Sequence, residues 1–313
     1  MITVRVAALE ICAQDVLRID LVAAADEPLP AFSAGAHVDV ELPGGVIRQY
    51  SICNDPGERH RYRLAVLRDA ASRGGSSAAH ERLRGGDTVR ISPPRNHFEL
   101  VEHGTGAVLL AGGIGITPIL AMAYRLKAVG QDFELHYFAR SRDRAAFVDE
   151  IEQGPLGEHC RLHLGKPRSE LETIVRTASG ERHLYVCGPT GFIDAVVDEG
   201  LRSGMPRERL HTERFAGVAA PDGEDRPFRI VIASDGRVVE VAADQTAAEA
   251  LEGAGVFVPT SCGEGVCGTC LTGVIEGTPD HRDAFQTPQE RAANRGFTPC
   301  CSRALGEELV LDL

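Results

Sequence analysis

The chain has 313 residues, of which 43% are hydrophobic and 25% charged, so it is long enough for two or three globular domains with real cores. Its formal net charge of −12 argues against a nucleic-acid partner, because phosphates would be repelled. No apolar run approaches the length of a membrane span, and the first residues alternate like a strand, unlike a signal peptide. Nine cysteines, an odd number, do not suggest a disulfide framework, so we expect a cytoplasmic protein with no membrane partner.

Residues 1–103 read as short strands separated by turn signals. Strands are expected at about 4–9, 16–21, 37–42, 48–52, 62–67 and 88–91. Even spacing of short strands predicts an antiparallel β-barrel. Arg48 and Tyr50 share one face of a strand and offer a phosphate ligand and a flat ring. Glycines 74 and 75 precede a helix whose N-terminus could bind the same anion.

From about residue 104 the pattern changes to alternating strands and helices. Strands are expected at 107–111, 134–139, 161–164 and 183–187, and helices at 119–128, 145–152 and 192–201. This alternation predicts a doubly wound α/β sheet that binds ligands at the carboxyl ends of its strands. The loop G-G-I-G-I-T-P at 112–118 could reflect plain close packing. A second strand-end loop, C-G-P at 187–189, favours a cleft for a nicotinamide dinucleotide.

The last part of the chain predicts a small mixed sheet. Residues 217–226 are small, acidic and interrupted by proline, which indicates a linker. A hairpin signal at 234–236 follows, and Thr246 and Glu249 have capping-box spacing at a helix start. Strands at 272–275 and 309–311 complete a β-grasp pattern. Residues 227–313 carry thirteen acidic side chains and six arginines, which could steer a basic protein partner or simply keep the surface solvated.

Four cysteines have the spacing of plant-type [2Fe–2S] ligands: Cys262, Cys267 and Cys270, with a distant fourth at 300 or 301. Glycines 263, 265 and 268 would let the backbone curl and aim N–H groups at the sulfurs. Zinc sites usually contain paired C-x2-C knuckles, and only one such pair is present. Neighbouring strand residues point to opposite faces, so only one of the two last cysteines can face the cluster, and we choose Cys300.

The order of these motifs resembles the phthalate dioxygenase reductase family over essentially all 313 residues. The motifs are R-x-Y-S at 48–51, G-G-S at 74–76, G-G-I-G-I-T-P at 112–118, C-G-P at 187–189, E-R-F at 213–215, D-H-R-D at 280–283 and C-C-S-R-A at 300–304. The resemblance implies an FMN-binding β-barrel at 1–103, an NAD-binding α/β domain at 104–216, a linker at 217–226 and an α+β ferredoxin domain at 227–313.

The resemblance also implies site residues. FMN would be held by Arg48, Tyr50, Ser51, Ala65, Val66, Leu67, Gly74, Gly75 and Ser76. NADH would be bound by Gly112, Gly113, Gly115, Thr117, Pro118, Cys187, Gly188 and Pro189. Thr117 would lie near the flavin, Cys187 near the hydride-donating carbon, and Phe215 over the flavin ring. Cys187 could equally be a small apolar strand-end residue. His281 and Arg282 would either help to dock the domains or form a solvated charge cluster.

Electron counting connects the three cofactors. NADH releases two electrons as hydride and the cluster accepts one, so a flavin is needed between them. By resemblance we expect a monomeric NADH-dependent reductase that serves a separate Rieske-type oxygenase acting on an aromatic acid. The alternatives are the same module serving a cytochrome P450 or another iron monooxygenase, and a non-catalytic ferredoxin-type carrier. Arg140 and Arg142 could accept the 2′-phosphate of NADPH, and FAD is the alternative flavin.

Overall fold

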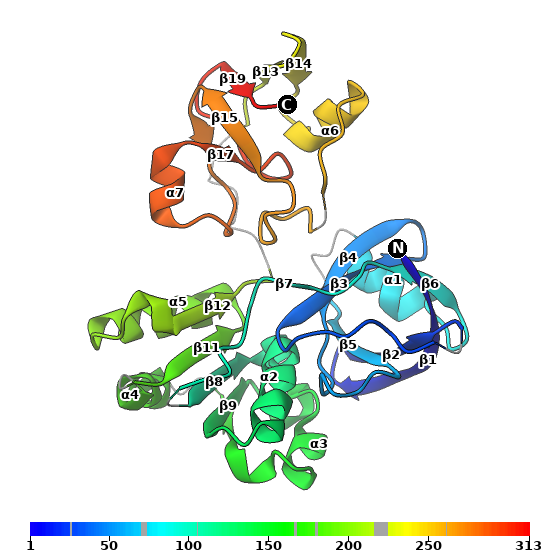
Figure 1. Cartoon of the computed structure of the whole chain (residues 1–313), viewed down its shortest axis with the longest axis vertical. Helices are drawn as coiled ribbons and strands as arrows, with labels where there is room; N and C mark the ends of the chain where they lie inside the picture. The colour runs from blue at the N-terminus through cyan, green and yellow to red at the C-terminus, as the bar shows by residue number, and fades with distance from the viewer. Residues whose placement is uncertain are drawn as a thin grey trace. The chain divides into compact units, whose positions relative to one another are not determined.

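The structure is a computed structural model that describes residues 1–25, 27–69, 74–104, 106–165, 168–178, 181–215, 225–260 and 262–313. It divides into two compact units, Met1–Arg214 and Phe215–Leu313 (Figure 1). Most of the linker predicted at 217–226 lies outside the described residues. The predicted boundary at 103/104 falls inside the first unit and stays a prediction.

The first unit begins with an antiparallel sheet. Its elements are β1 (Ile2–Ala13), β2 (Val16–Ala23), β3 (Ala36–Leu42), β4 (Val46–Ser51), β5 (Tyr62–Leu67), α1 (Gly75–Arg82), β6 (Thr88–Ile91) and β7 (Arg95–Asn96). The described strands follow the order β4-β3-β6-β1-β2-β5, with β7 paired to β3. The two end strands, β4 and β5, contact each other, so the sheet curls into the predicted barrel. β1 is longer than expected because two register shifts let it bend.

A parallel sheet follows in the same unit. Its elements are β8 (Ala107–Gly112), η1 (Gly113–Gly115), α2 (Ile116–Ala128), β9 (Phe133–Ala139), η2 (Arg142–Arg144), α3 (Val148–Gln153), η3 (Gly157–His159), β10 (Cys160–Leu164), α4 (Arg168–Ala178), β11 (His183–Cys187), α5 (Thr190–Arg202), η4 (Arg207–Arg209) and β12 (Leu210–Glu213). The strand order is β10-β9-β8-β11-β12, and the pairs are parallel.

Alternate residues of β8 enter two different cores, as a doubly wound sheet requires. Leu109 packs with residues of α2 and α3, whereas Val108 and Leu110 pack with residues of α4 and α5. The strand order reverses between β8 and β11. In an open parallel sheet, that reversal places a ligand crevice at the carboxyl ends of these two strands.

Three local features of this sheet differ from the expectation. The helix predicted at 145–152 begins only at Val148, because Phe147 has a left-handed φ of 63°. Helix α4 was not predicted, although Leu171, Val175 and Ala178 bury one helical face. Strand β12 was also missed, since it is four residues long and only Leu210 is fully buried.

The second unit has the expected mixed sheet. Its elements are β13 (Phe228–Ile232), β14 (Val238–Val241), α6 (Ala247–Gly253), β15 (Thr272–Glu276), β16 (Pro279–Asp280), α7 (Pro288–Ala293), β17 (Gly296–Phe297), β18 (Arg303–Ala304) and β19 (Glu308–Leu311). The order is β14-β13-β19-β15-β17, with β13 parallel to β19 and the other pairs antiparallel. The predicted capping box at Thr246 and Glu249 is confirmed.

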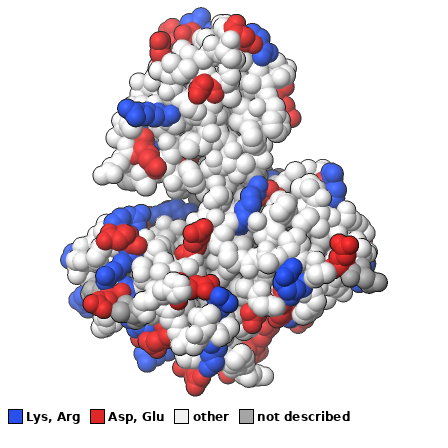
Figure 2. Space-filling model, viewed as in Figure 1, with Lys and Arg blue, Asp and Glu red and all other residues white. Residues whose placement is uncertain are grey.

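Charges are mixed on the surface in view. Figure 2 shows acidic and basic groups interspersed, without a continuous acidic area among the described residues on this face. Steering of a basic partner by acidic residues therefore stays a prediction. Within the described parts of the chain, no helix combines the length and the apolar character that crossing a membrane would need.

Candidate functional site

The four predicted cluster ligands form one buried group in the second unit. The thiol of Cys262 lies beside those of Cys267 and Cys300, and the Cys300 thiol also lies beside that of Cys270. All four side chains are buried, and these four cysteines form no disulfide bonds. The fold thus brings Cys300 to a loop that ends thirty positions earlier in the sequence.

The loop around these cysteines suits thiolate ligands. The backbone N–H groups of Glu264 and Val266 donate to Cys262 Sγ at 3.3 and 3.4 Å. Interactions with the thiols of Cys267 and Cys300, and hydrogen bonds from these amides, lower the pKa of Cys262, whereas the same interactions between thiols raise the pKa of Cys267 and of Cys300. Gly265 has a φ of +72°, and a Cβ there would lie 2.4 Å from Cys301 Sγ. The residues present therefore fit an iron–sulfur cluster, whose sulfurs need both thiolates and nearby N–H donors.

Cys301 points to a different environment from Cys300. Its Sγ lies 3.5 Å from Thr298 Oγ1 and 3.8 Å from Ser302 Oγ. Its thiol also contacts that of Cys300, whereas Cys300 in addition contacts Cys262 and Cys270. This placement supports the choice of Cys300 as the fourth ligand, which stays a prediction.

A cradle for a phosphate lies between β4 and the start of α1. A Cβ built on Gly75 would come within 2.6 Å of Arg48 Cγ and 2.7 Å of its Nε, so only glycine allows this approach without displacing the arginine. Gly74, at the N-cap, has a φ of +89°. Ser76 Oγ accepts a hydrogen bond from the Asp69 amide at 3.1 Å. A guanidinium beside a helix N-terminus fits the phosphate of FMN.

The other predicted flavin residues lie on β4 and β5. Burial raises the pKa of the partly exposed Tyr50 to about 12. Ala65 packs at the junction with the parallel sheet, and Leu67 is exposed. The side chain of Val66 instead lies in the barrel core, so it is not available to a ligand. Side chains alternate between the two faces of a strand, so Val66 points to the opposite face from Ala65 and Leu67. The resemblance alone did not separate these two faces.

The two predicted glycine loops pack backbone to backbone at the sheet reversal. A Cβ on Gly188 would lie 2.9 Å from Gly112 Cα. A Cβ on Gly115 would lie 2.2 Å from the carbonyl oxygen of Cys187. Thr117 is buried in the first turn of α2 and donates to the Ile114 carbonyl at 3.0 Å.

Four predicted residues remain, three of them in these two loops and one in the second unit. Pro118 is buried in α2. The ring of Pro189 comes within 3.0 Å of a Cβ built on Gly112, while Gly113 has open space at its Cβ position. Phe215 is exposed and is the first residue of the second unit. The structure therefore packs the loops at 112–118 and 187–189 against each other at the carboxyl ends of β8 and β11.

Glu213 is a residue that the sequence reasoning missed. The pairing of β11 with β12 places it beside the buried Cys187, and Ser51 at the end of β4 hydrogen-bonds to its carboxyl group. Its Oε2 is buried without a hydrogen-bond partner among the described residues. Burial raises the pKa of Glu213 to about 8. The signal was present in the E-R-F motif, from which only Phe215 was selected.

Arg142 is held by carboxylates of α3. Its Nη2 lies 2.6 Å from Asp149 Oδ1 and 2.6 Å from Glu152 Oε2, and its Nη1 donates to Glu152 Oε1 at 3.0 Å. Arg140 is exposed. Of the two arginines that could have accepted a 2′-phosphate, Arg142 thus already faces two negative charges.

Arg282 binds carboxylates within its own unit. Its Nη2 lies 2.7 Å from both Asp225 and Asp280. Its neighbour His281 contacts Asn294 Oδ1 at 3.2 Å. Arg282 therefore attaches the described end of the predicted linker to the second unit.

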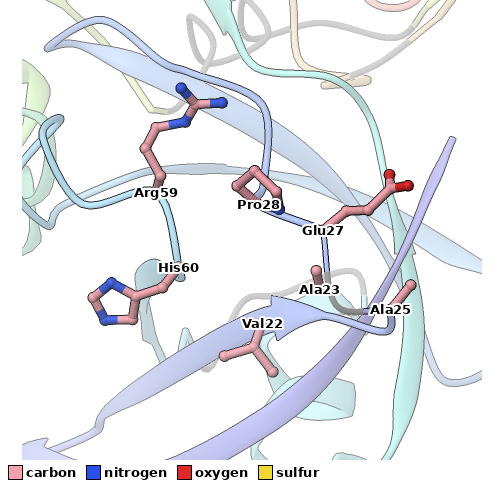
Figure 3. Close-up of a pocket in the computed structure, with 7 residues that line it drawn as sticks. All are labelled: Val22, Ala23, Ala25, Glu27, Pro28, Arg59 and His60. Carbon is pink, nitrogen blue, oxygen red and sulfur yellow. The ribbon is translucent and has the colours of Figure 1, made fainter.

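A shallow pocket of about 410 Å³ opens on the barrel and contains none of the predicted site residues. Figure 3 shows Arg59 and His60 on the left of this pocket and Ala25 and Glu27 on the right. The remaining lining residues are Val22, Ala23 and Pro28. The pocket is wide open to solvent and lacks a buried charged group, so we assign it no function.

Comparisons with known proteins agree with this arrangement. Residues 230–305 match the family model of the 2Fe-2S iron-sulfur cluster binding domain. The whole chain is 50% identical to the vanillate O-demethylase oxidoreductase of Pseudomonas sp. (strain HR199 / DSM 7063), with 100% of both chains covered. It superposes on the solved structure of phthalate dioxygenase reductase with a TM-score of 0.81 and 36% identity, covering 99% of this chain and 97% of that one.

A second solved structure is larger than this chain. An intact type IV self-sufficient cytochrome P450 monooxygenase matches with a TM-score of 0.81 and 40% identity. The match covers 100% of this chain but 41% of the monooxygenase. The similarity thus spans the whole chain here and less than half of the larger protein.

Proposed function

Because the chain belongs to the phthalate dioxygenase reductase family of NADH-dependent flavin and iron–sulfur oxidoreductases, we propose that it is the reductase component of a Rieske-type oxygenase acting on an aromatic acid. Electrons would pass from NADH through FMN and a [2Fe–2S] cluster to that separate oxygenase. The observation that carries the proposal is the full-length, 50% identity to a vanillate O-demethylase oxidoreductase. A non-catalytic ferredoxin-type carrier does not fit a match of this extent.

The barrel residues would hold the flavin. FMN, when bound, accepts electrons in a pair and releases them singly. Arg48 would bind its phosphate together with the helix start at Gly74, Gly75 and Ser76. Tyr50, Ser51 and the strand at 65–67 would lie along its ring. The close approach of Arg48 to Gly75 supports this assignment.

The crevice at the sheet reversal would hold NADH. The glycines at 112, 113, 115 and 188, with Pro118 and Pro189, would allow the close approach of the dinucleotide. Thr117 and Cys187 would lie at its reactive end, and Phe215 would cover the flavin ring in the absence of nicotinamide. Cys262, Cys267, Cys270 and Cys300 would ligate the two irons. The contacts between their thiols support this set.

Glu213 makes the reaction pH-dependent in this proposal. Its carboxyl group is neutral below its pKa of about 8 and becomes negative beside Cys187 as the pH rises through that value. We expect flavin reduction by NADH to slow by roughly tenfold between pH 7 and 9, because a buried negative charge opposes the arrival of a hydride.

The variant Glu213→Gln stays neutral and keeps a hydrogen-bonding group near Ser51. Its rate of flavin reduction by NADH should therefore not change between pH 7 and 9. Anaerobic stopped-flow absorbance of the flavin measures both rates. A variant whose rate falls with pH as steeply as that of the wild type would show that another group titrates.

The proposed coenzyme is NADH. In a doubly wound sheet, the loop after the second strand lies where the adenosine ribose binds. Asp149 and Glu152 hold Arg142 there and would repel a 2′-phosphate. We expect kcat/KM for NADH to exceed that for NADPH by at least about tenfold. The double variant Asp149→Asn/Glu152→Gln removes both negative charges, so it should lower the ratio of kcat/KM for NADH to kcat/KM for NADPH.

A matched control for this comparison is Glu158→Gln, because Glu158 pairs with Lys127 at 2.7 Å on another part of the same domain. It should leave the ratio unchanged. A wild-type preference for NADPH would refute the coenzyme assignment.

The function is tested by reconstitution. The purified chain, supplied with FMN, iron and sulfide, should reduce cytochrome c with NADH and support turnover of vanillate or a related aromatic acid by a Rieske-type oxygenase. Failure to oxidise NADH after reconstitution would refute the reductase assignment. We also propose that the protein is cytoplasmic and monomeric, and size-exclusion chromatography tests the monomer. The proposed domain boundaries are 103/104, 216/217 and 226/227, and limited proteolysis tests them.

The cytochrome P450 alternative is supported by the 40% identity to part of a self-sufficient monooxygenase. In that alternative the same electron route ends at a haem protein. Electron transfer to a cytochrome P450 but not to any Rieske-type oxygenase would favour it.

A further inference from the structure

Arg63 is a buried charge shared between the barrel and the parallel-sheet part of the first unit. It lies on β5, opposite Asp20 on β2, and its Nε donates to Asp20 Oδ1 at 2.9 Å. Its Nη1 donates to both carboxylate oxygens of Glu150 on α3, at 2.8 and 3.0 Å. Asp20 and Arg63 are each only 7% exposed. One guanidinium therefore joins a barrel carboxylate to a carboxylate of the nucleotide part.

This junction is supported from two further directions. The hydroxyl of Tyr124 on α2 donates to Glu150 Oε1 at 3.3 Å. The turn between β1 and β2 also reaches the segment before α3, because the Gln14 amide donates to the Asp143 carbonyl at 2.7 Å. Residues 143–150, which include the first turn of α3, are thus attached to the barrel at two separate points.

The same strand leads directly to the predicted flavin site. Arg63 and Ala65 share one face of β5, opposite to Leu64 and Val66, which fill the barrel core. Ala65 packs in the cluster that includes Ile116 and Cys187 of the predicted nicotinamide crevice. Arg63 therefore lies on the same face of β5 as Ala65, two residues away, and Ala65 packs where the barrel and the parallel sheet meet.

We propose that Arg63 and Glu150 are positioning residues for the reaction, which fix strand β5 relative to the glycine loops at 112–118 and 187–189. The inference rests on the proposed FMN and NADH sites. Neither residue is assigned to a ligand, so both act through the placement of other groups. Transfer between two bound groups depends steeply on their separation, and a displacement of about 1 Å can cost about 100-fold in rate.

The test uses the full-length reconstituted protein with Glu150→Ala and Glu150→Gln. The limiting rate of flavin reduction at saturating NADH should fall about tenfold in Glu150→Ala and less in Glu150→Gln, which keeps the side chain's size. The apparent Kd for NADH should change little. The isotope effect with 4-deuterated NADH should rise, because transfer becomes more fully rate-limiting.

A readout independent of activity is amide hydrogen exchange. Peptides that cover β5 and residues 142–153 should exchange faster in Glu150→Ala than in the wild type. The matched control is Arg61→Ala, because Arg61 also pairs with Asp20, at 3.4 Å, and with Glu58, at 2.7 Å, but these contacts lie within the barrel. It should keep the wild-type limiting rate and isotope effect.

The inference is wrong if Glu150→Ala loses thermal stability yet retains the wild-type limiting rate and isotope effect. Should Glu150→Ala fail to fold, unchanged rates in both Glu150→Gln and Arg63→Lys would overturn it equally. If the wild type binds flavin and oxidises NADH, and the variants do so at the same rates, only the positioning role is refuted. A wild-type protein that does neither refutes the proposed function itself.

Discussion

Replacing Cys300 by serine should abolish the iron–sulfur cluster, whereas replacing Cys301 should leave it in place. The Cys300 thiol contacts both Cys262 and Cys270, while Cys301 lies beside Thr298 and Ser302. Two irons need four thiolates, so the loss of one should reduce iron and sulfide from about two each per chain to near zero. Cys300→Ser should also lose the low-temperature EPR signal of the reduced protein.

The pair of variants separates the two halves of the electron route. Cys300→Ser should keep its flavin and still reduce ferricyanide with NADH, but it should lose most cytochrome c reduction. Cys301→Ser should resemble the wild type in both assays. The reverse pattern, with a cluster in Cys300→Ser and none in Cys301→Ser, would show that the fourth ligand has been assigned to the wrong cysteine.

Gly115→Ala should nearly eliminate the use of NADH. The added Cβ would lie 2.2 Å from the carbonyl oxygen of Cys187 and 2.6 Å from the Gly188 nitrogen, and backbone atoms cannot rotate away as a flexible side chain can. The two loops of the crevice must therefore separate. We expect kcat/KM for NADH to fall by roughly 100-fold, because the dinucleotide is then misplaced by an ångström or more.

Gly191→Ala is the matched control, since a Cβ at Gly191 on α5 meets no atom within 4 Å. It should leave kcat/KM for NADH unchanged. Both variants should retain FMN and the cluster, so chemical reduction by dithionite should still produce the reduced spectra. Wild-type kinetics in Gly115→Ala would mean that the contact between the loops is not needed for NADH binding.

Much of this protein could be predicted because its signals are local. The cysteine spacing, the glycine loops and the capping box at Thr246 each depend on residues a few positions apart. The change from short, evenly spaced strands to alternating strands and helices predicted the barrel and the doubly wound sheet. The family resemblance then connected these motifs in the observed order.

The missed features depend on contacts between distant segments. Glu213 meets Cys187 only through the register of β12 on β11, and it meets Ser51 only because the barrel adjoins the parallel sheet. Arg142 looked available to a phosphate until α3 brought Asp149 and Glu152 to it. Asp149 and Glu152 are only 7 and 10 residues from Arg142, but they reach it across the turn at Phe147, so this pairing leaves no regular spacing signal either.

The strand order of the second unit has a consequence for biosynthesis. Strand β19 (Glu308–Leu311) is synthesised after all the other strands of that unit, yet it lies between β13 and β15 in the sheet. Until β19 is in place, β13 is paired only with β14 and β15 only with β17, so the sheet that carries the cysteine loop stays in two pieces. Assembly of the cluster in this domain should therefore wait for β19, the strand that joins the two pieces of the sheet.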